Sequence, residues 1–412
     1  MSEPPHDPEL PAASSAADVD SAPAVASDAA PAASDTAPPA GEMSPTELAE
    51  AKRYGRAQLR CEIADQLLDL AYLLLFAVVV AIPLDRWLEG FIASAPLRLL
   101  ALFALVTLGH ELVSVPLSYY SGFVLEHRFG LSRLTAGRWV VRHLKQLALA
   151  LVLGGVMFAG LYAIIWGVGA WWWLCAALIF FVVSVVLTQL MPVVFLPLFH
   201  KIERLDDAEL MARMARLAAG TGLSIAGVYR LDLSNETTKA NAMLAGLGQT
   251  RRVLLGDTLL AQFTPDEIEV ILAHEVGHHV HRHIRKLIVA GAVASVAAFA
   301  LCDGLVGHWV NRQLGTTVGP AAWPVWTLPL VMGVVTAFFM VLGPLQNALS
   351  RRFERQCDRY ALERTGQREA YISAFHKLAR LNKDDPEPSA LEVFLFHSHP
   401  PIAERLRLAE PR

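Results

Sequence analysis

Two histidines and a glutamate in the stretch His274-Glu275-Val276-Gly277-His278 have the types and spacing of a catalytic zinc site. On an α-helix, a spacing of four residues puts both imidazoles on one face, one turn apart, where they can bind the same metal ion. Glu275 lies one residue round from His274, close enough to act on a zinc-bound water without itself binding the metal. The pattern predicts hydrolysis by zinc-activated water, with His274 and His278 as ligands and Glu275 as general base.

The segment that carries this motif is predicted to be a helix whose start is specified locally. Thr264 can cap the first turn, Pro265 suits the first helical position, and Glu267 completes a Thr-x-x-Glu capping box. A basic run ending at Lys286 precedes the next apolar segment. We therefore expect one helix that serves both as the zinc platform and as the entry to a membrane span.

Further histidines follow the motif, and we expect them to be interfacial or solvated rather than to bind metal: His279, His281 and His283. A metzincin has its third histidine six residues after the motif, and that position here holds Ile284. The third ligand must therefore come from elsewhere in the chain.

Carboxylates near the end of the chain are candidates for that role. Glu354 and Asp358 are four residues apart in a segment of helical character and share a face. A carboxylate from a second helix, Glu354, is the expected third ligand and leaves the fourth position for water. Asp358 can accept the free ring N–H of a ligating histidine. On charge pattern alone this segment would be a solvated, salt-bridged helix, and only the histidine helix upstream favours the ligand role.

Two residues in the carboxy-terminal motif could assist the reaction. His399, in the stretch His399-Pro400-Pro401, and Arg405 can donate hydrogen bonds to the oxyanion that forms when hydroxide attacks the scissile carbonyl. We predict both as catalytic residues.

Composition indicates a polytopic membrane protein. Of the 412 residues, 54% are hydrophobic and only 18% are charged, with a mean hydropathy of +0.39. The net charge of -4 argues against nucleic acid as a partner, since no basic cluster with interleaved aromatics offsets it. The four cysteines are scattered and fit neither a disulfide framework nor a zinc knuckle.

The order of apolar and polar segments predicts the domain organisation. Residues 1–45, rich in Ala, Pro and Ser, are expected to form a disordered tail. Six runs have the length of a span: 67–84, 99–121, 146–168, 172–197, 287–307 and 325–347. They predict a membrane region at 46–197, a first part of the zinc peptidase domain at 198–286, further spans at 287–347 and a second part of the domain at 348–412. Basic residues before the first span and in the 122–145 loop place both domain parts on the cytoplasmic face.

The first polar part should contain a small antiparallel sheet. A helix is predicted over 206–219, and strands over 224–233 and 240–255, the latter broken near 246–249. Residues 241–246 are our candidate edge strand, at which Asn241 and Ala242 would bind substrate backbone as an added strand. An ordinary hairpin of a small domain fits the same residues.

Taken together, the motifs resemble those of the integral-membrane zinc metallopeptidases of the CAAX prenyl protease 1 type, with the bacterial heat-shock membrane protease as a more distant relative. The resemblance rests on these stretches: Glu126 to Arg133, Pro197 to Lys201, Asn241-Ala242 with Gly246, the His274 motif, Ser350-Arg351-x-x-Glu354-x-x-Cys357-Asp358, and His399-Pro400-Pro401 with Arg405. Cys357 stands where the family usually has alanine. The resemblance covers nearly the whole chain after the tail.

The resemblance implies a mainly α, polytopic fold with a small α+β gluzincin-like protease domain. It also implies one Zn²⁺ per chain, the lipid bilayer as surroundings, and a peptide or membrane-protein substrate, either a prenylated carboxy-terminal tail or a damaged membrane protein. The preference for Arg over Lys and the Ala-rich tail suggest a bacterial inner membrane. The competing hypothesis is a non-enzymatic membrane protein, a transporter or an inactive protease relative, with a structural metal site.

Overall fold

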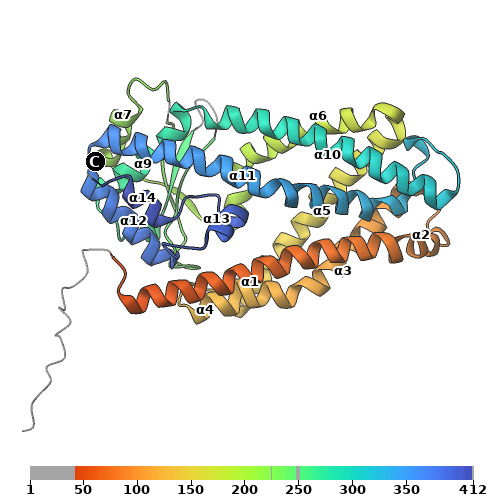
Figure 1. Ribbon diagram of the computed structural model, residues 1–412, viewed down its shortest axis with the longest axis horizontal. Helices are drawn as coiled ribbons and strands as arrows, with labels where there is room; N and C mark the ends of the chain where they lie inside the picture. Colours follow the sequence, from red (N-terminus) through yellow and green to blue (C-terminus); the bar gives the residue numbers. More distant parts are fainter. Residues whose placement is uncertain (1–41, 224, 247–250, 411–412) are drawn as a thin grey trace, which may run out of the picture. The chain divides into compact units, whose positions relative to one another are not determined.

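The computed structural model describes residues 42–223, 225–246 and 251–410, which are mainly helical (Figure 1). The predicted tail, residues 1–45, lies outside these ranges except for its last few residues. The first helix, α1 (Pro45–Leu75), begins at Ser44, whose side chain accepts a hydrogen bond from the backbone N–H of Glu47 in a capping box.

Five continuous helical stretches in the described residues are long and apolar enough to cross a membrane, in place of the six separate spans that were predicted. They are Pro45–Glu89, with α1 and α2 (Ala81–Glu89); Ala95–Arg128, with α3 (Ala95–Tyr119) and α4 (Glu126–Arg128); Ala136–Leu198, with α5 (Ala136–Val168) and α6 (Trp172–Leu190); α10 (His283–Leu314); and Val325–Thr365, with α11 (Leu328–Thr365).

The third stretch accounts for the difference in number. A straight helix of its 63 residues would be about 95 Å long, far more than the roughly 30 Å of a bilayer core. Gly169, with φ of 70°, lies where α5 ends and turns the chain, so that α5 and α6 pack against each other. This stretch therefore contains two of the predicted spans, 146–168 and 172–197.

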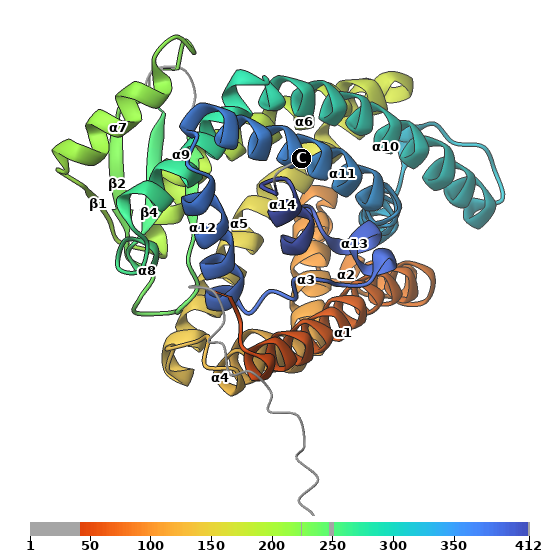
Figure 2. The same ribbon diagram turned by 60° about the vertical axis from the view of Figure 1, so that its left-hand side comes forward.

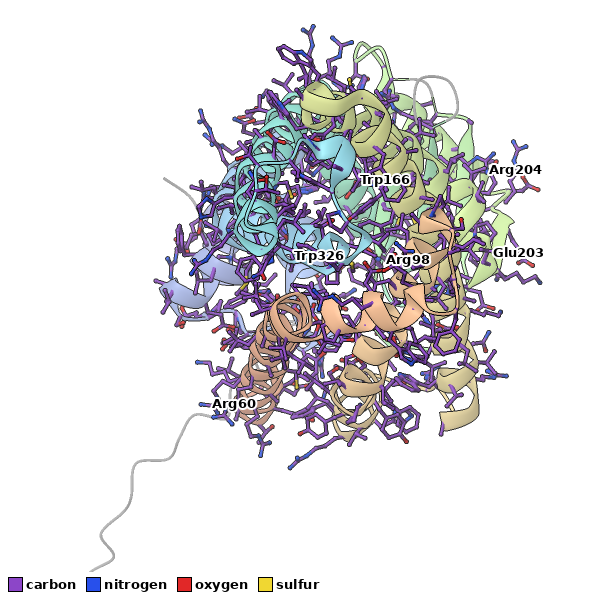
Figure 3. All side chains as sticks on the ribbon, turned by 90° about the vertical axis from the view of Figure 1, so that its right-hand side faces the viewer. Arg60, Arg98, Trp166, Glu203, Arg204 and Trp326 are labelled. Carbon is purple, nitrogen blue, oxygen red and sulfur yellow. The ribbon has the colours of Figure 1, made fainter. Side chains whose placement is uncertain are left out.

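Aromatic side chains fill the core between the long helices, and two of the tryptophans donate hydrogen bonds across it. The Trp166 indole donates to the carbonyl of Trp323 (3.0 Å), and the Trp172 indole donates to Asp303 (2.7 Å). Figure 3 shows Trp166 among the side chains of this bundle, whereas Arg204 extends outward. These bonds offset the cost of burying the indole N–H groups of Trp166 and Trp172, whereas those of Trp309 and Trp323 are buried without a partner among the described residues.

A four-stranded sheet lies beside the helices that carry the motifs (Figure 2). Its strands are β1 (Ile202–Arg204), β2 (Gly227–Leu231), β3 (Ala242–Ala245) and β4 (Arg252–Gly256), in the order β1-β2-β4-β3. The prediction of an antiparallel sheet was wrong in part, because β2 and β4 pair in parallel, and β1 was not predicted. β3 lies at the edge, as expected. Residues 224 and 247–250, within the predicted strands, lie outside the described ranges.

Short helices complete this part of the chain. They are α7 (Ala208–Ala218), α8 (Asp257–Leu260), α9 (Pro265–Val280), α12 (Arg368–Asn382), α13 (Ala390–Phe396) and α14 (Ile402–Arg407). Apolar side chains of α7, α9 and α12 share one core with β2 and β4. The prediction of a helix over 206–219 is confirmed by α7, which Asp207 caps.

The predicted single helix through Lys286 is wrong, because the chain breaks between α9 and α10. α9 ends at Val280, and Arg282 adopts the left-handed conformation, with φ of 56°. α10 then begins at His283 in a new direction. α9 and α10 are thus consecutive but separate helices.

The amino-terminal helices contact the segment that leads into β3. Lys239, two residues before Asn241, pairs with Glu126 of α4 (Nζ to Oε2, 2.9 Å) and donates to the Tyr54 hydroxyl of α1 (2.9 Å). A β-bridge between Ser132 and Thr237 lies beside this pair. The membrane region therefore helps to position the edge strand.

Candidate metal centre and active site

Helix α9 carries His274, Glu275 and His278, and it begins at the capping box that the sequence predicts. Thr264 caps the helix and Glu267 completes the capping box. His274 is buried, with 8% of its surface exposed, whereas Glu275 and His278 are partly exposed. A buried imidazole needs partners for both of its nitrogens.

Helix α11 places Glu354 between the two imidazoles. Its Oε2 lies 3.1 Å from Nε2 of His274, and its Oε1 lies 3.3 Å from Nε2 of His278. Zinc–ligand distances of about 2.0–2.1 Å in a tetrahedral site put neighbouring ligand atoms roughly 3.3 Å apart. Oε2 of Glu354 is buried and has no hydrogen-bond partner among the described residues. The three side chains therefore fit a zinc ion, which would satisfy that oxygen.

Cys357 is a second candidate ligand, because its sulfur and ligand nitrogens of His274 and His278 lie within 4.8 Å of one another. Its Sγ, however, lies 3.6 Å from Nδ1 of His283, and Nδ1 of His283 faces Nδ1 of His278. The Nε2 atoms face Glu354 instead. A Cβ on Gly277 would lie only 3.1 Å from Cα of Cys357, so this glycine allows α9 and α11 their close approach. Glu354 is therefore better placed than Cys357 to be the third ligand.

Asp358 and Arg405 form a buried pair behind His274. Nδ1 of His274 lies 2.9 Å from Oδ1 of Asp358, which fits the orienting contact that the sequence predicts. Arg405 donates to both oxygens of Asp358, at 3.0 Å from Nε and 2.6 Å from Nη2. Arg405 was predicted as an oxyanion donor, but its nearest partner is Asp358, and its Nη2 lies 3.9 Å from Glu354.

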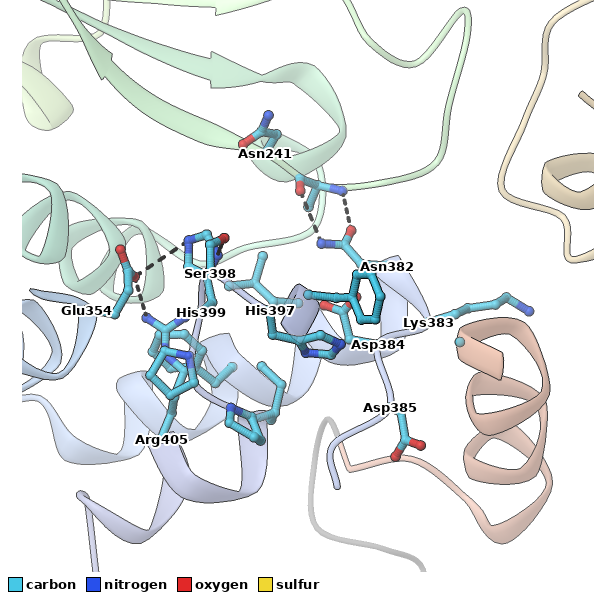
Figure 4. Close-up of a pocket in the computed structure, with 18 of the residues that line it drawn as sticks. Asn241, Glu354, Asn382, Lys383, Asp384, Asp385, His397, Ser398, His399 and Arg405 are labelled. Carbon is cyan, nitrogen blue, oxygen red and sulfur yellow. Dashed lines mark hydrogen bonds and ion pairs between the residues drawn. The ribbon is translucent and has the colours of Figure 1, made fainter. Parts of the chain in front are cut away.

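His399 borders the open side of the site. Figure 4 shows His399 beside Glu354. Its Nε2 lies 3.6 Å from Oε2 of Glu354, and 64% of its side chain is exposed. A cavity of about 520 Å³ extends from His274 and Glu275 past His399 to Gln58 and Glu62 of α1. The space in front of the ligands is thus large enough for a peptide segment.

The edge strand β3 borders the same cavity. The backbone N–H of Gly256 in β4 donates to the carbonyl of Asn241 (2.9 Å), so this carbonyl points into the sheet. By the alternation of an antiparallel ladder, the backbone groups of Ala242 and Leu244 point outward. The N–H of Leu244 lies 3.4 Å from Oε2 of Glu275. Asn241 itself is exposed, and Ala242 is half-buried beside it.

Comparison with known proteins identifies the family. Residues 31–201 match the amino-terminal region of the CAAX prenyl proteases, which has five membrane helices, and residues 204–412 match peptidase family M48. The chain belongs to peptidase family M48. CAAX prenyl protease 1 of Saccharomyces cerevisiae is 28% identical over 393 residues, with 89% of this chain and 86% of the relative covered. An uncharacterized metalloprotease of Bacillus subtilis is 27% identical, with the same coverage of each chain.

The fold agrees with this family. The crystal structure of S. mikatae Ste24p superposes with a TM-score of 0.77 at 26% identity, covering 89% of each chain. This M48 peptidase is accordingly a multi-pass membrane zinc metalloprotease. The alternative of a non-enzymatic membrane protein with a structural metal is not favoured.

Two sets of contacts that support the M48 site were not predicted from the sequence, although Arg351 belongs to the Ser350–Asp358 motif. Asn382 of α12 accepts from the backbone N–H of Ala240 (3.0 Å) and so holds the chain just before β3 (Figure 4). Arg351 of α11 donates to the carbonyls of Val393 (2.7 Å) and His397 (2.5 Å), which fixes the segment that leads to the predicted catalytic histidine. Such contacts between distant segments leave no local pattern.

The pKa of His274 predicts how pH affects the zinc-free M48 peptidase. Burial alone would lower this pKa, but hydrogen bonds to Asp358 and Glu354 outweigh it and raise the pKa to about 9. The protonated ring therefore stabilises the folded chain fully below pH 6.5, and this contribution is lost as the pH rises through about 9. The thermal unfolding temperature of chelator-treated protein should fall over this window.

Zinc reverses the direction of this effect. Because zinc binds the unprotonated ring, the apparent zinc affinity should increase as the pH rises towards 9. Differential scanning fluorimetry from pH 6 to 9.5 checks both predictions. With chelator the unfolding temperature should fall as the pH rises, and the further stabilisation by excess zinc should grow. An unfolding temperature of the chelated protein that increases across the window would contradict the raised pKa.

Proposed function

We propose that this chain is an endopeptidase that holds one Zn²⁺ with His274, His278 and Glu354. The observation that carries the proposal is the Glu354 carboxylate, whose two oxygens face the Nε2 atoms of both histidines at the edge of a peptide-sized cavity. Three protein ligands with an open fourth position are typical of catalytic rather than structural zinc. Bound zinc lowers the pKa of a water ligand to about 7, which makes hydroxide available at neutral pH.

The surrounding side chains would then move protons and stabilise charge. Glu275 removes the proton from the attacking water and passes it to the leaving amine. His399, exposed beside Glu354, donates to the oxyanion at the scissile carbonyl. Asp358 fixes the tautomer of His274, and Arg405 neutralises Asp358 and adds positive charge near the oxyanion.

The substrate would bind in an extended conformation along β3. The outward backbone groups of Ala242 and Leu244 can pair with a peptide strand, which brings one of its carbonyls to Glu275. Asn241, exposed at the start of the strand, can add a side-chain bond to the substrate backbone. Such pairing uses hydrogen bonds to the substrate backbone and does not depend on the substrate sequence. Selectivity among substrates must therefore come from pockets that bind their side chains.

For the cellular setting we propose the inner membrane of a bacterium, with the zinc peptidase domain facing the cytoplasm. The basic residues before α1 and in the 122–145 loop support this orientation through the positive-inside rule. The domain is formed by residues 198–286 and 348–412, which converge on one site although spans 287–347 separate them in sequence.

The test is cleavage by purified protein reconstituted in liposomes. Because similar proteins are named CAAX prenyl protease 1, the first substrate is a prenylated carboxy-terminal peptide, with the unprenylated peptide as its matched control. We expect chelator-sensitive cleavage that zinc restores. Preference for the prenylated peptide would assign the prenyl protease activity, and equal cleavage of both would favour general degradation of membrane proteins. Absence of cleavage of both peptides and of an unfolded membrane protein would contradict the proposal.

A further inference from the structure

His283 is buried immediately behind the second zinc ligand, contrary to the expectation that it is interfacial or solvated. Only 1% of its surface is exposed. The left-handed turn at Arg282 starts α10 so that the His283 ring lies against His278, with ring centroids 5.2 Å apart. Phe353 stacks on the His283 ring, with centroids 4.1 Å apart and planes 10° from parallel. The ring is therefore held in one orientation.

Both nitrogens of this buried ring have polar partners. Nδ1 of His283 lies 3.1 Å from Nδ1 of His278, and Nε2 of His283 lies 2.9 Å from Oε1 of Gln356. Gln356 belongs to α11, two residues after Glu354, so the contacts link both helices of the zinc site. The chain of contacts therefore runs from Gln356 through His283 to His278.

The protons in this chain of contacts can be arranged in only one way if Nε2 of His278 binds zinc. A neutral ligating imidazole carries its proton on the other nitrogen, so Nδ1 of His278 must donate. Nδ1 of His283 must then accept, which leaves the His283 proton on Nε2. That N–H requires an acceptor, and Oε1 of Gln356 is the atom at 2.9 Å. The Gln356 amide therefore has its oxygen towards His283, which is the orientation that the zinc-binding tautomer of His278 requires.

We propose that Gln356 and His283 form a hydrogen-bond relay that fixes the tautomer and ring orientation of His278 for zinc binding. The relay rests on the proposed zinc site. It makes His283 and Gln356 positioning residues, since neither reaches the cavity in front of the ligands.

The relay also makes the two histidine ligands unequal. Nδ1 of His274 faces the carboxylate of Asp358, which carries charge and pairs with Arg405. Nδ1 of His278 faces a neutral imidazole that ends on a neutral amide. A carboxylate partner raises the basicity of a ligand more than a neutral acceptor does. Orientation is therefore the main contribution of the relay.

Zinc affinity, measured by competition with a chromophoric chelator on full-length protein in detergent, tests the relay. His283→Phe keeps an aromatic ring against Phe353 but removes the acceptor, and Gln356→Leu removes the terminal oxygen. Each change should weaken zinc binding about 10- to 100-fold. Gln356→Glu keeps an acceptor and should bind at least as tightly as wild type. His279→Phe, the same substitution one residue after His278, should leave the affinity unchanged.

Two further measurements separate a relay from a purely structural role. The double variant His283→Phe/Gln356→Leu should bind zinc no more weakly than His283→Phe alone, because Gln356 acts through His283. The visible spectrum of the cobalt-substituted protein should change in His283→Phe and in Gln356→Leu but not in His279→Phe. Wild-type affinity in both single variants, or additive losses in the double variant, would overturn the relay. A wild-type protein that binds no zinc would instead refute the zinc site itself.

Discussion

Replacing Glu275 with glutamine should lower kcat for peptide cleavage about 10²–10⁴-fold while zinc stays bound, because the amide cannot take the proton of the attacking water. Glu275 is partly exposed at the cavity, and its Oε2 lies 3.4 Å from the N–H of Leu244, where a bound peptide would pass. It does not touch the ligand atoms as Glu354 does. The measurement is turnover of a fluorogenic peptide, together with zinc content by mass spectrometry.

The matched control for this variant is Asp266→Asn. Asp266 lies on the same helix, but its side chain is exposed and pairs with Arg213 away from the cavity. This variant should keep both zinc and turnover. Full cleavage by zinc-loaded Glu275→Gln would show that another group acts as the base. Comparison of membrane proteomes from cells with wild type and with Glu275→Gln would then identify physiological substrates.

Exchange of Glu354 for glutamine should remove zinc and with it all measurable cleavage. The neutral amide offers a weaker ligand than the carboxylate whose oxygens lie 3.1 and 3.3 Å from the Nε2 atoms. The loss of affinity should exceed the roughly 10- to 100-fold that follows when a residue that only orients a ligand is changed. Chelator competition and turnover at matched zinc concentrations measure the two effects.

Cys357→Ala is the control that distinguishes Glu354 from Cys357 as the third zinc ligand. The thiol lies on the Nδ1 side of His278, near His283, so the alanine variant should retain zinc and activity. Alanine also leaves room for Gly277, which contacts Cys357 across the two helices. If Cys357→Ala lost zinc and Glu354→Gln kept it, the third ligand would be the thiolate rather than the carboxylate.

Features of the site that lie within one helix could be predicted from sequence. The spacing of His274 and His278, and that of Glu354 and Asp358, follows from helix geometry. The capping box at Thr264 also sets the start of α9 from adjacent residues alone. In each case the relevant distance is fixed by a few consecutive residues, so no knowledge of tertiary packing was needed.

Features that depend on distant segments could not be predicted in this way. The parallel pairing of β2 with β4 depends on the position of β3, which lies between them in sequence but at the edge of the sheet. The strand β1 has only three residues, too few for a recognisable alternation of apolar and polar side chains. Arg282 adopts a left-handed conformation without being glycine, so no residue type marked the break before α10. The burial of His283 and the pairing of Arg405 with Asp358 depend in turn on such long-range contacts.

The wide sequence separation of the site residues also sets the order in which the site can assemble during synthesis. Arg405 follows His274 by 131 positions. At about 5–20 residues per second, a ribosome needs roughly 7–26 s to cover that distance. During this interval the growing chain contains His274 but lacks Arg405, the partner that neutralises Asp358. The Asp358–Arg405 pair behind His274 can therefore form only several seconds after the two histidines of α9 have been added to the chain.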